Sequence, residues 1–245
     1  MDLQLRGKKA LVLGSSQGIG RAIAESLIAE GARVVLCSRK EPELSKLSRE
    51  IGATGFVVAD LSQPDQGRNA CQEAIRLLDG LDILVTNTGG PAKGTFMEIS
   101  TDQWQRDYQN LWLSVVECFR VALPEMKKNN YGRLLLVTSI AGKEPLPALT
   151  TSNGLRAGLE GLSKSISTEY APFGITVNIL RPGYTNTDRL KELKLSDEQV
   201  KKMVPTGRLG APQELADLAT FLASPRAGYI TGQCISIDGG VQKSY

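Results

Sequence analysis

Three glycines near the amino terminus have the spacing of a loop that binds the diphosphate of a dinucleotide. Gly14, Gly18 and Gly20 lie in "LVLGSSQGIGRAIAESL", between an apolar run and a segment with helical spacing. In this arrangement the first glycine permits a tight turn, the second lets the backbone approach the phosphates, and the third permits close packing of the helix. The helix N-terminus then favours the negative charge. The residues expected to contact the dinucleotide here are Gly14, Ser15, Ser16, Gln17, Gly18, Ile19 and Gly20.

The second apolar run ends in a hydroxyl and a guanidinium. A site that prefers NAD(H) usually places a carboxylate there, which binds the ribose hydroxyls. This chain reads "VVLCSRK", with Ser38 and Arg39 at that place. Both groups can bind a 2′-phosphate, which a carboxylate would repel. The pattern favours NADP(H) over NAD(H), unless Arg39 is only an exposed residue after a strand.

The chain contains no histidine, which narrows the chemistry further. A Ser-His-Asp site, a histidine general base and the commonest metal ligand are therefore excluded. The four cysteines, Cys37, Cys71, Cys118 and Cys234, lie far apart without a C-x-x-C pair. This spacing favours reduced thiols in a core over a disulfide or a metal site. We expect no metal, so any catalysis must use hydroxyls, carboxylates, amines or a cofactor.

The elements that would position these residues alternate along the chain. The expected strands are "KKALVLG", "ARVVLCS", "GFVVAD", "LDILVTN", "GRLLLVTS", "GITVNILRPG" and "QCISIDGG". The expected helices are "GRAIAESLIAEG", "EPELSKLSREIG", "QPDQGRNACQEAIRLLDG", "TDQWQRDYQNLWLSVVECFRVALPEMKKN" and residues 151–173. This order predicts a Rossmann-type, doubly wound α/β sheet of about seven parallel strands with helices on both faces. We see no repeat or linker, so we expect one domain over residues 1–245.

Residues 187–209 interrupt the alternation. The segment "TDRLKELKLSDEQVKKMVPTGRL" is charged and only weakly apolar on one face. Two interpretations remain open. It is either a solvated pair of surface helices or a mobile lid over a pocket at the carboxyl ends of the strands.

The charge distribution and the apolar runs also exclude some partners. The formal charge is +3, and the basic residues are scattered rather than gathered in a stripe, so nucleic acid is not an expected partner. No apolar stretch reaches the roughly 18 residues of a membrane span, and the first residues lack the order of a signal peptide. We therefore expect a cytoplasmic protein without a membrane partner.

The motifs together resemble the short-chain dehydrogenase/reductase family, in particular its 3-oxoacyl-acyl-carrier-protein reductase-like members. The resemblance covers residues 8–240. Its motifs are "GSSQGIG", "VVADLS", "TNTGG", "YQNLWL", "LLLVTSIAG", "LRPGYTNT" and "YITGQCISIDGG". It implies an acid, Asp60, beside the adenine. The further cofactor contacts that it implies are Leu61, Asn87, Gly89, Arg156, Pro182, Gly183, Thr185 and Thr187, with Thr86 where the family has its first asparagine.

The resemblance also assigns catalytic roles. In the family a serine polarises the substrate carbonyl, a tyrosine transfers the proton, a lysine holds the ribose and lowers the tyrosine pKa, and an asparagine completes a water relay. Ser139 and Asn110 match the serine and the asparagine. A gapless alignment from Ser139 places Ser152 at the tyrosine and Arg156 at the lysine. Arg156 can still bind a ribose and keep a positive charge there. Ser152 is a poorer acid than a tyrosine, which titrates near about 10.

Two routes could supply the missing proton. Tyr184 lies on the loop expected to face the nicotinamide and could present its phenol, although an aromatic wall of the substrate pocket is the more ordinary role for it. Alternatively, Ser139 could act with a water held by Ser152, Asn110 and Arg156. A Tyr184→Phe substitution separates the two routes.

Two functions from different classes fit these features. The first is an NADP(H)-dependent oxidoreductase that interconverts a carbonyl and an alcohol, with a 3-oxoacyl thioester among the candidate substrates. The second is a catalytically inactive NADP(H)-binding homologue with a structural or regulatory role. The resemblance implies a homodimer or homotetramer, with Trp104, Trp112 and Phe119 either at the contact or in the core. Lys93 is either an anchor for an acidic substrate or a solvated loop residue.

Overall fold

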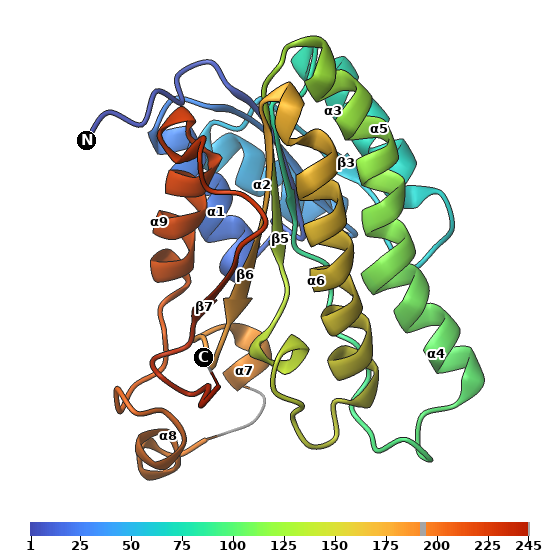
Figure 1. Cartoon of the computed structure of the whole chain (residues 1–245), viewed down its shortest axis with the longest axis vertical. Coiled ribbons are helices and arrows are strands. Elements are labelled where there is room, and N and C mark those ends of the chain that lie inside the picture. The colour runs from blue at the N-terminus through green and yellow to red at the C-terminus, as the bar shows by residue number, and fades with distance from the viewer. Residues whose placement is uncertain (192–194, 245) are drawn as a thin grey trace.

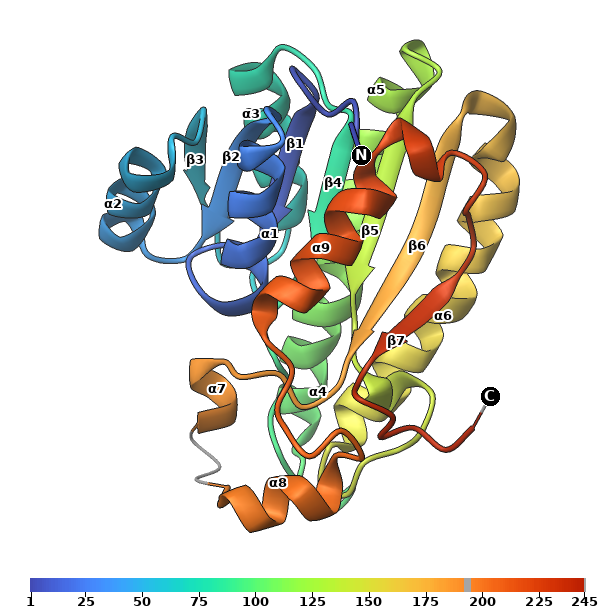
Figure 2. The same ribbon diagram turned by 90° about the vertical axis from the view of Figure 1, so that its left-hand side faces the viewer.

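The computed structural model describes residues 1–191 and 195–244, and its centre is one parallel sheet. The seven strands lie in the order β3-β2-β1-β4-β5-β6-β7, and every paired neighbour is parallel (Figure 2). Their bounds are Lys9–Leu13 (β1), Arg33–Ser38 (β2), Gly55–Val58 (β3), Ile83–Thr86 (β4), Gly132–Val137 (β5), Ile175–Pro182 (β6) and Cys234–Ile237 (β7). The predicted doubly wound α/β fold is confirmed.

Helices cover both faces of the sheet, so the molecule has three layers (Figure 1). The main helices are Gly18–Ala29 (α1), Glu41–Ile51 (α2), Gln66–Leu78 (α3), Thr101–Tyr108 (α4), Ser114–Lys128 (α5), Thr150–Tyr170 (α6), Asp188–Lys191 (α7), Asp197–Met203 (α8) and Pro212–Ala223 (α9). Buried side chains of α1, α2 and α9 form one core against the sheet, and those of α3, α5 and α6 form the other. The central strands are apolar over most of their length, as expected for strands that are covered on both faces.

The chain reverses its direction of winding between β1 and β4, which are neighbours in the sheet. The segment after β1 leads to β2 on one side, whereas the segment after β4 leads to β5 on the other. In open parallel sheets this switch point leaves a crevice at the carboxyl edge, where ligands bind. The glycine loop follows β1, and Asn87 follows β4. The fold therefore brings both of these predicted cofactor contacts to the crevice.

The long helix expected from residue 101 to residue 129 is interrupted. α4 and α5 are joined by a π-helical segment, Gln109–Leu113, so the regular hydrogen-bond pattern changes for five residues. π-helical segments occur often at functional sites, and this one contains Asn110. The Ser114 hydroxyl donates to the Asn110 carbonyl oxygen at 2.6 Å. Phe119, expected either at a subunit contact or in the core, lies in the core.

The candidate lid forms two short helices beyond the carboxyl edge of the sheet. α7 and α8 both lie below the ends of the strands in Figure 2. α8 begins with a capping box, in which the Ser196 hydroxyl accepts from the Gln199 backbone N–H and the Gln199 side chain accepts from the Ser196 N–H. Residues 192–194 lie outside the described residues. The position agrees with the helix-pair interpretation, and closure over the crevice stays a prediction.

The described part of the chain contains no candidate membrane span and no candidate metal cluster. No helix there has both the length and the apolar character that crossing a bilayer requires. No group of three or more histidine, cysteine, aspartate or glutamate side chains among those residues is placed to hold a metal ion.

Candidate active site

The glycine loop forms a backbone cradle that has no room for side chains. A Cβ built on Gly14 would lie 2.2 Å from the Asn87 carbonyl oxygen, and one built on Gly20 would lie 2.3 Å from the Gly14 carbonyl oxygen. Gly14 also has a φ of +59°, which favours glycine. The Asn87 amide donates to the Gly14 carbonyl oxygen at 3.1 Å and joins the two loops. The helix α1 begins within the loop, at Gly18, so the cradle fits a diphosphate.

The residues of the loop do not all face the crevice. Ser15 is fully buried, and its hydroxyl accepts from the Cys37 backbone N–H at 2.9 Å, which ties the loop to β2. Ser16 and Ile19 are half-buried, and Gln17 is exposed. Ser15 can therefore contribute backbone to a ligand, whereas its hydroxyl already has a structural partner.

The end of β2 holds the two groups expected at a 2′-phosphate. The Ser38 hydroxyl oxygen is buried without a hydrogen-bond partner among the described residues, which is unusual for a buried polar atom. Arg39 is exposed, and in the described part of the chain its guanidinium forms no ion pair. An unpaired hydroxyl beside an unpaired cation is a donor set that suits a phosphate.

The strand β3 is followed by two predicted cofactor contacts, Asp60, expected beside the adenine, and Leu61. The Asp60 carboxylate accepts from the Ser62 backbone N–H at 3.1 Å and from the Ser62 hydroxyl at 2.8 Å. These bonds fix the turn after the strand. Both use Oδ1 of Asp60, so Oδ2 takes no part in the turn. Leu61 packs into the core formed with α3, α5 and α6.

The loop after β6 closes the crevice opposite the glycine loop. Thr187 approaches Gly18, because a Cβ built on Gly18 would lie 3.3 Å from Thr187 Cγ2. Gly183 lies against Asp238 beyond β7, and Thr185 is buried. The loop after Pro182 thus brings Thr187 next to Gly18 of the glycine loop, where the diphosphate is expected. Tyr184 is half-buried, and its hydroxyl has no hydrogen-bond partner within the described residues.

Ser152 and Arg156 form a buried pair on consecutive turns of α6. Their exposed fractions are 4% and 7%. Arg156 Nε donates to the Ser152 hydroxyl oxygen at 3.1 Å, and Arg156 Nη1 donates to the Val137 carbonyl oxygen at 3.3 Å. Val137 is the last residue of β5, so these two bonds attach the pair to the carboxyl edge of the sheet.

The Arg156 guanidinium is a cation without a carboxylate partner in the described part of the chain. Burial, and to a lesser degree the charge of Arg189, lowers the pKa of Arg156 to about 10. The guanidinium therefore remains protonated at neutral pH. It keeps a fixed positive charge at the Ser152 oxygen, where it favours any negative charge that develops nearby.

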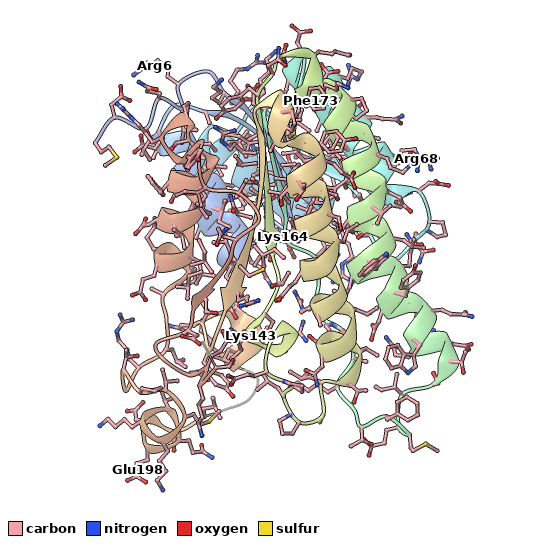
Figure 3. All side chains as sticks on the ribbon, in the orientation of Figure 1. Arg6, Arg68, Lys143, Lys164, Phe173 and Glu198 are labelled. Carbon is pink, nitrogen blue, oxygen red and sulfur yellow. The ribbon has the colours of Figure 1, made fainter. Side chains whose placement is uncertain are left out.

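Ser139 lies two residues beyond Val137, at the start of the short 3₁₀ turn Ile140–Gly142. Its hydroxyl oxygen accepts from the Ala141 backbone N–H at 3.1 Å. The turn packs on α6, because a Cβ built on Gly142 would lie 3.4 Å from Arg156 Cβ. Figure 3 shows Lys143, directly after this turn, beside α6. Ser139 and the Ser152–Arg156 pair thus meet at one edge of the sheet.

The sequence comparison identifies the family. A sequence profile described as enoyl-(acyl carrier protein) reductase matches residues 14–242. The 3-oxoacyl-[acyl-carrier-protein] reductase FabG of Salmonella typhimurium is 35% identical over 243 residues, which are 98% of this chain and 99% of that protein. The chain belongs to the short-chain dehydrogenase/reductase family.

Two solved structures have the same fold as this chain. L-sorbose reductase from Gluconobacter frateurii, complexed with NADPH and L-sorbose, has a TM-score of 0.93 and 31% identity, with 100% of both chains covered. An NADPH-bound short chain oxidoreductase from Pseudomonas aeruginosa PAO1, described as containing an atypical catalytic center, has a TM-score of 0.89 and 30% identity, with 96% of this chain and 97% of that chain covered.

Asn110, a site residue that the resemblance predicts, makes a long hydrogen bond with the loop after β4. Its amide donates to the Gly89 carbonyl oxygen at 3.5 Å, from the π-helical segment. The preceding helix, α4, is held to α6 by its buried carboxylate Asp107, which accepts from the Thr151 hydroxyl at 2.8 Å and, within α4, from the Gln103 amide at 2.8 Å. These bonds set the distance between the helix that carries Asn110 and the helix that carries Ser152.

Arg189 is the site residue that the sequence analysis missed. Arg189 lies in the candidate lid. Its side chain reaches the loop after β4, where its Nη2 donates to the Pro91 carbonyl oxygen at 3.2 Å. A side chain at residue 90 would occupy the same space, because a Cβ built on Gly90 would overlap the Arg189 guanidinium. The available signal was the pair of glycines in "TNTGG", residues 86–90, together with the arginine in "TNTDR", residues 185–189.

Proposed function

We propose that this protein is an NADP(H)-dependent oxidoreductase that interconverts a carbonyl and an alcohol. The buried Ser152–Arg156 pair carries the proposal, because it joins a fixed cation and a hydroxyl to the end of β5, where Ser139 lies. The relatives include a 3-oxoacyl-[acyl-carrier-protein] reductase, and L-sorbose reductase and the Pseudomonas aeruginosa oxidoreductase are described with NADPH. A 3-oxoacyl thioester is one candidate substrate class.

The cofactor choice rests on the end of β2. The unpartnered Ser38 hydroxyl and the unpaired Arg39 guanidinium suit a 2′-phosphate, and the glycine loop suits the diphosphate. These features favour NADP(H) over NAD(H). When bound, the cofactor supplies or accepts the hydride, so the protein must bind and orient both molecules and move one proton.

The chain needs its own route for transferring the proton to the substrate oxygen, because Ser152 stands where the family has its tyrosine. Because Arg156 Nε donates to the Ser152 oxygen, the Ser152 hydroxyl keeps its own hydrogen for donation. A serine is shorter than the tyrosine it stands for, so we infer a water between Ser152 and the substrate oxygen. Ser139 polarises the carbonyl, Arg156 favours the negative charge that develops, and Asn110 holds the water from the opposite helix.

We also propose that the chain forms one domain and that residues 187–209 act as its substrate lid. α7 and α8 lie beyond the carboxyl edge of the sheet (Figure 2). Arg189 reaches from this segment to the loop after β4. A lid in this place would exclude water from the crevice after both ligands have bound.

The proposal is tested by the initial rate of NADPH oxidation across a panel of carbonyl compounds that includes acetoacetyl thioesters. NADPH binding is first confirmed by fluorescence. We expect Ser139→Ala and Ser152→Ala to lower kcat by about a hundredfold or more, the usual contribution of general acid catalysis. Ser165→Ala, which removes an exposed hydroxyl from the same helix as Ser152, is the matched control and should not change kcat.

Tyr184→Phe separates the two proton routes. We expect unchanged turnover, because the water route does not use the phenol. A loss as large as that of Ser152→Ala would instead make Tyr184 the donor. If NADPH binds and no compound is reduced by the unaltered protein, the alternative of an inactive NADP(H)-binding homologue is favoured.

A further inference from the structure

The guanidinium of Arg189 fills the space beside Gly90, in the loop after β4. A Cβ built on Gly90 would lie 1.0 Å from Arg189 Nη1, so the guanidinium lies where a side chain at residue 90 would otherwise be. Its Nη2 donates to the Pro91 carbonyl oxygen at 3.2 Å. Asn110 contacts the adjoining residue of the same loop, Gly89, which places Arg189 at the catalytic end of the crevice.

The charge of Arg189 is not neutralised by a neighbour. The adjacent carboxylate, Asp188, accepts from Lys191 Nζ at 2.9 Å. In the described ranges of the chain, neither Arg189 nor Arg156 forms an ion pair, although they lie close enough for the charge of Arg189 to lower the pKa of Arg156. Arg189 is exposed to solvent, whereas Arg156 is buried, so the guanidinium of Arg189 is the one that an incoming anion can reach.

We propose that Arg189 binds a carboxylate of the substrate, so the carbonyl compound that this protein reduces is an oxo acid. This inference rests on the proposed oxidoreductase function and names its substrate class. A guanidinium offers parallel N–H donors that match the two oxygens of a carboxylate. The cofactor also carries anionic groups, but its diphosphate is expected at the glycine loop, whereas Arg189 lies on the loop after β4.

The test compares each oxo acid with its own methyl ester. Pyruvate, acetoacetate and laevulinate place the carboxylate at increasing distance from the carbonyl, and the esters keep the carbonyl but lose the charge. Binding of each compound to the protein saturated with NADP⁺ is measured by calorimetry, and kcat/KM is measured with NADPH. Three variants are compared with the unaltered protein: Arg189→Met, Arg189→Lys and Lys191→Met.

We expect at least one acid to bind about tenfold or more tightly than its ester, as loss of a charged hydrogen bond implies. Arg189→Met should remove this preference, and Arg189→Lys should restore part of it, since lysine keeps the charge without the fork. Lys191→Met is the matched control: it removes one positive charge from the same helix, and the preference should persist. The affinity for NADPH should stay within about twofold in all three variants.

Two results would overturn the inference. One is equal binding of acid and ester to the unaltered protein, or a preference that Arg189→Met leaves intact. The other is a large loss of NADPH affinity in Arg189→Met with no change in the preference, which would assign the guanidinium to the cofactor's phosphates. If the acid preference depends on Arg189 but no compound is reduced, the anion site stands and the proposed oxidoreductase function fails.

Discussion

At the scale of single residues, the guanidinium of Arg156 is buried beside a hydroxyl and a carbonyl oxygen rather than beside a carboxylate. Burying a charge without an opposite charge is costly. An arginine tolerates this better than a lysine, because its ordinary pKa is higher and it remains protonated at the lowered pKa of about 10. The choice of arginine at residue 156 therefore preserves a cation in a place where a lysine would more easily lose its proton.

Replacing Arg39 tests the predicted preference for NADP(H) over NAD(H). We expect Arg39→Ala to raise the Kd for NADPH about tenfold or more, as loss of a charged hydrogen bond implies, and to leave the Kd for NADH almost unchanged. Fluorescence titration measures both values. Arg49→Ala, which removes an exposed arginine from the other end of α2, is the control. Tighter binding of NADH than of NADPH by the unaltered protein would contradict the choice of NADP(H).

The sequence indicated Ser139, Ser152 and Arg156 through the family resemblance, because a gapless alignment from Ser139 places the other two at the family's tyrosine and lysine. It did not indicate Arg189, whose contact with Gly90 joins segments about a hundred residues apart. Neither did it show that the Ser15 hydroxyl bonds to Cys37, since the glycine motif defines backbone positions and says nothing of the direction of a side chain. Tertiary contacts decide both points.

At the scale of elements, two of the three glycines in α6 have opposite surroundings. A Cβ built on Gly158 would lie 2.6 Å from Trp112 Cζ3, whereas one built on Gly161 meets nothing within 4 Å. The first glycine lets the π-helical segment approach α6, and the second has no such role. Trp112, expected at a subunit contact or in the core, is thus engaged within the chain.

These two glycines provide a matched pair of substitutions. We expect Gly158→Ala to lower the free energy of unfolding by about 1–3 kcal/mol, because the indole must move. Gly161→Ala should raise it by about 0.5–1 kcal/mol, because alanine is the better helix former. Urea denaturation followed by circular dichroism measures both changes. Equal effects of the two substitutions would show that the contact with Trp112 does not constrain the helix.

Most helices and strands could be predicted from the sequence, but the π-helical segment could not. The strands follow from continuous apolar runs, and the helices from their spacing. The π-helical segment Gln109–Leu113 interrupts a pattern that reads as one helix from residue 101 to residue 129. An extra residue in a helical turn changes the apolar spacing very little, so the sequence pattern does not reveal it. Its position is set by contacts with Gly89 and α6.

At the scale of the whole molecule, the four thiols lie in or against one core, the one formed with α3, α5 and α6. Cys37, Cys71 and Cys118 are buried, Cys234 is half-buried, and all four are free. Burial raises the pKa of Cys37 to about 12, and burial followed by the charge of Cys37 raises that of Cys71 to about 12. These values agree with the expected reduced thiols of a core.

We expect the native protein to resist alkylation at neutral pH. With a pKa of about 12, only about one thiol in 10⁵ is a thiolate at pH 7, and the thiolate is the reactive form. Raising the pH increases this fraction until it is half at the pKa. Mass spectrometry after iodoacetamide treatment should find Cys37 and Cys71 unmodified in the native protein and all four cysteines modified in urea. Rapid native labelling of Cys37 would show that its core opens readily.

Assembly and location remain predictions at this scale. A groove between α5 and α6 is lined by Val116, Leu123, Leu162 and Ile166 together with charged residues at its rim. A homodimer or homotetramer would cover it, as the family resemblance implies. The cytoplasmic location and the absence of nucleic acid as a partner likewise stay predictions.

The order of the strands also bears on how the chain folds as it is synthesised. Every pairing in the sheet joins consecutive strands except that of β1 with β4. After β3 has emerged from the ribosome, one edge of β1 must wait for β4, some seventy residues after β1 in sequence, and an unpaired apolar edge is prone to aggregate. Once β4 has docked, each later strand can add to the edge just formed. The pairing that creates the ligand crevice is thus also the step at which the nascent chain most needs protection.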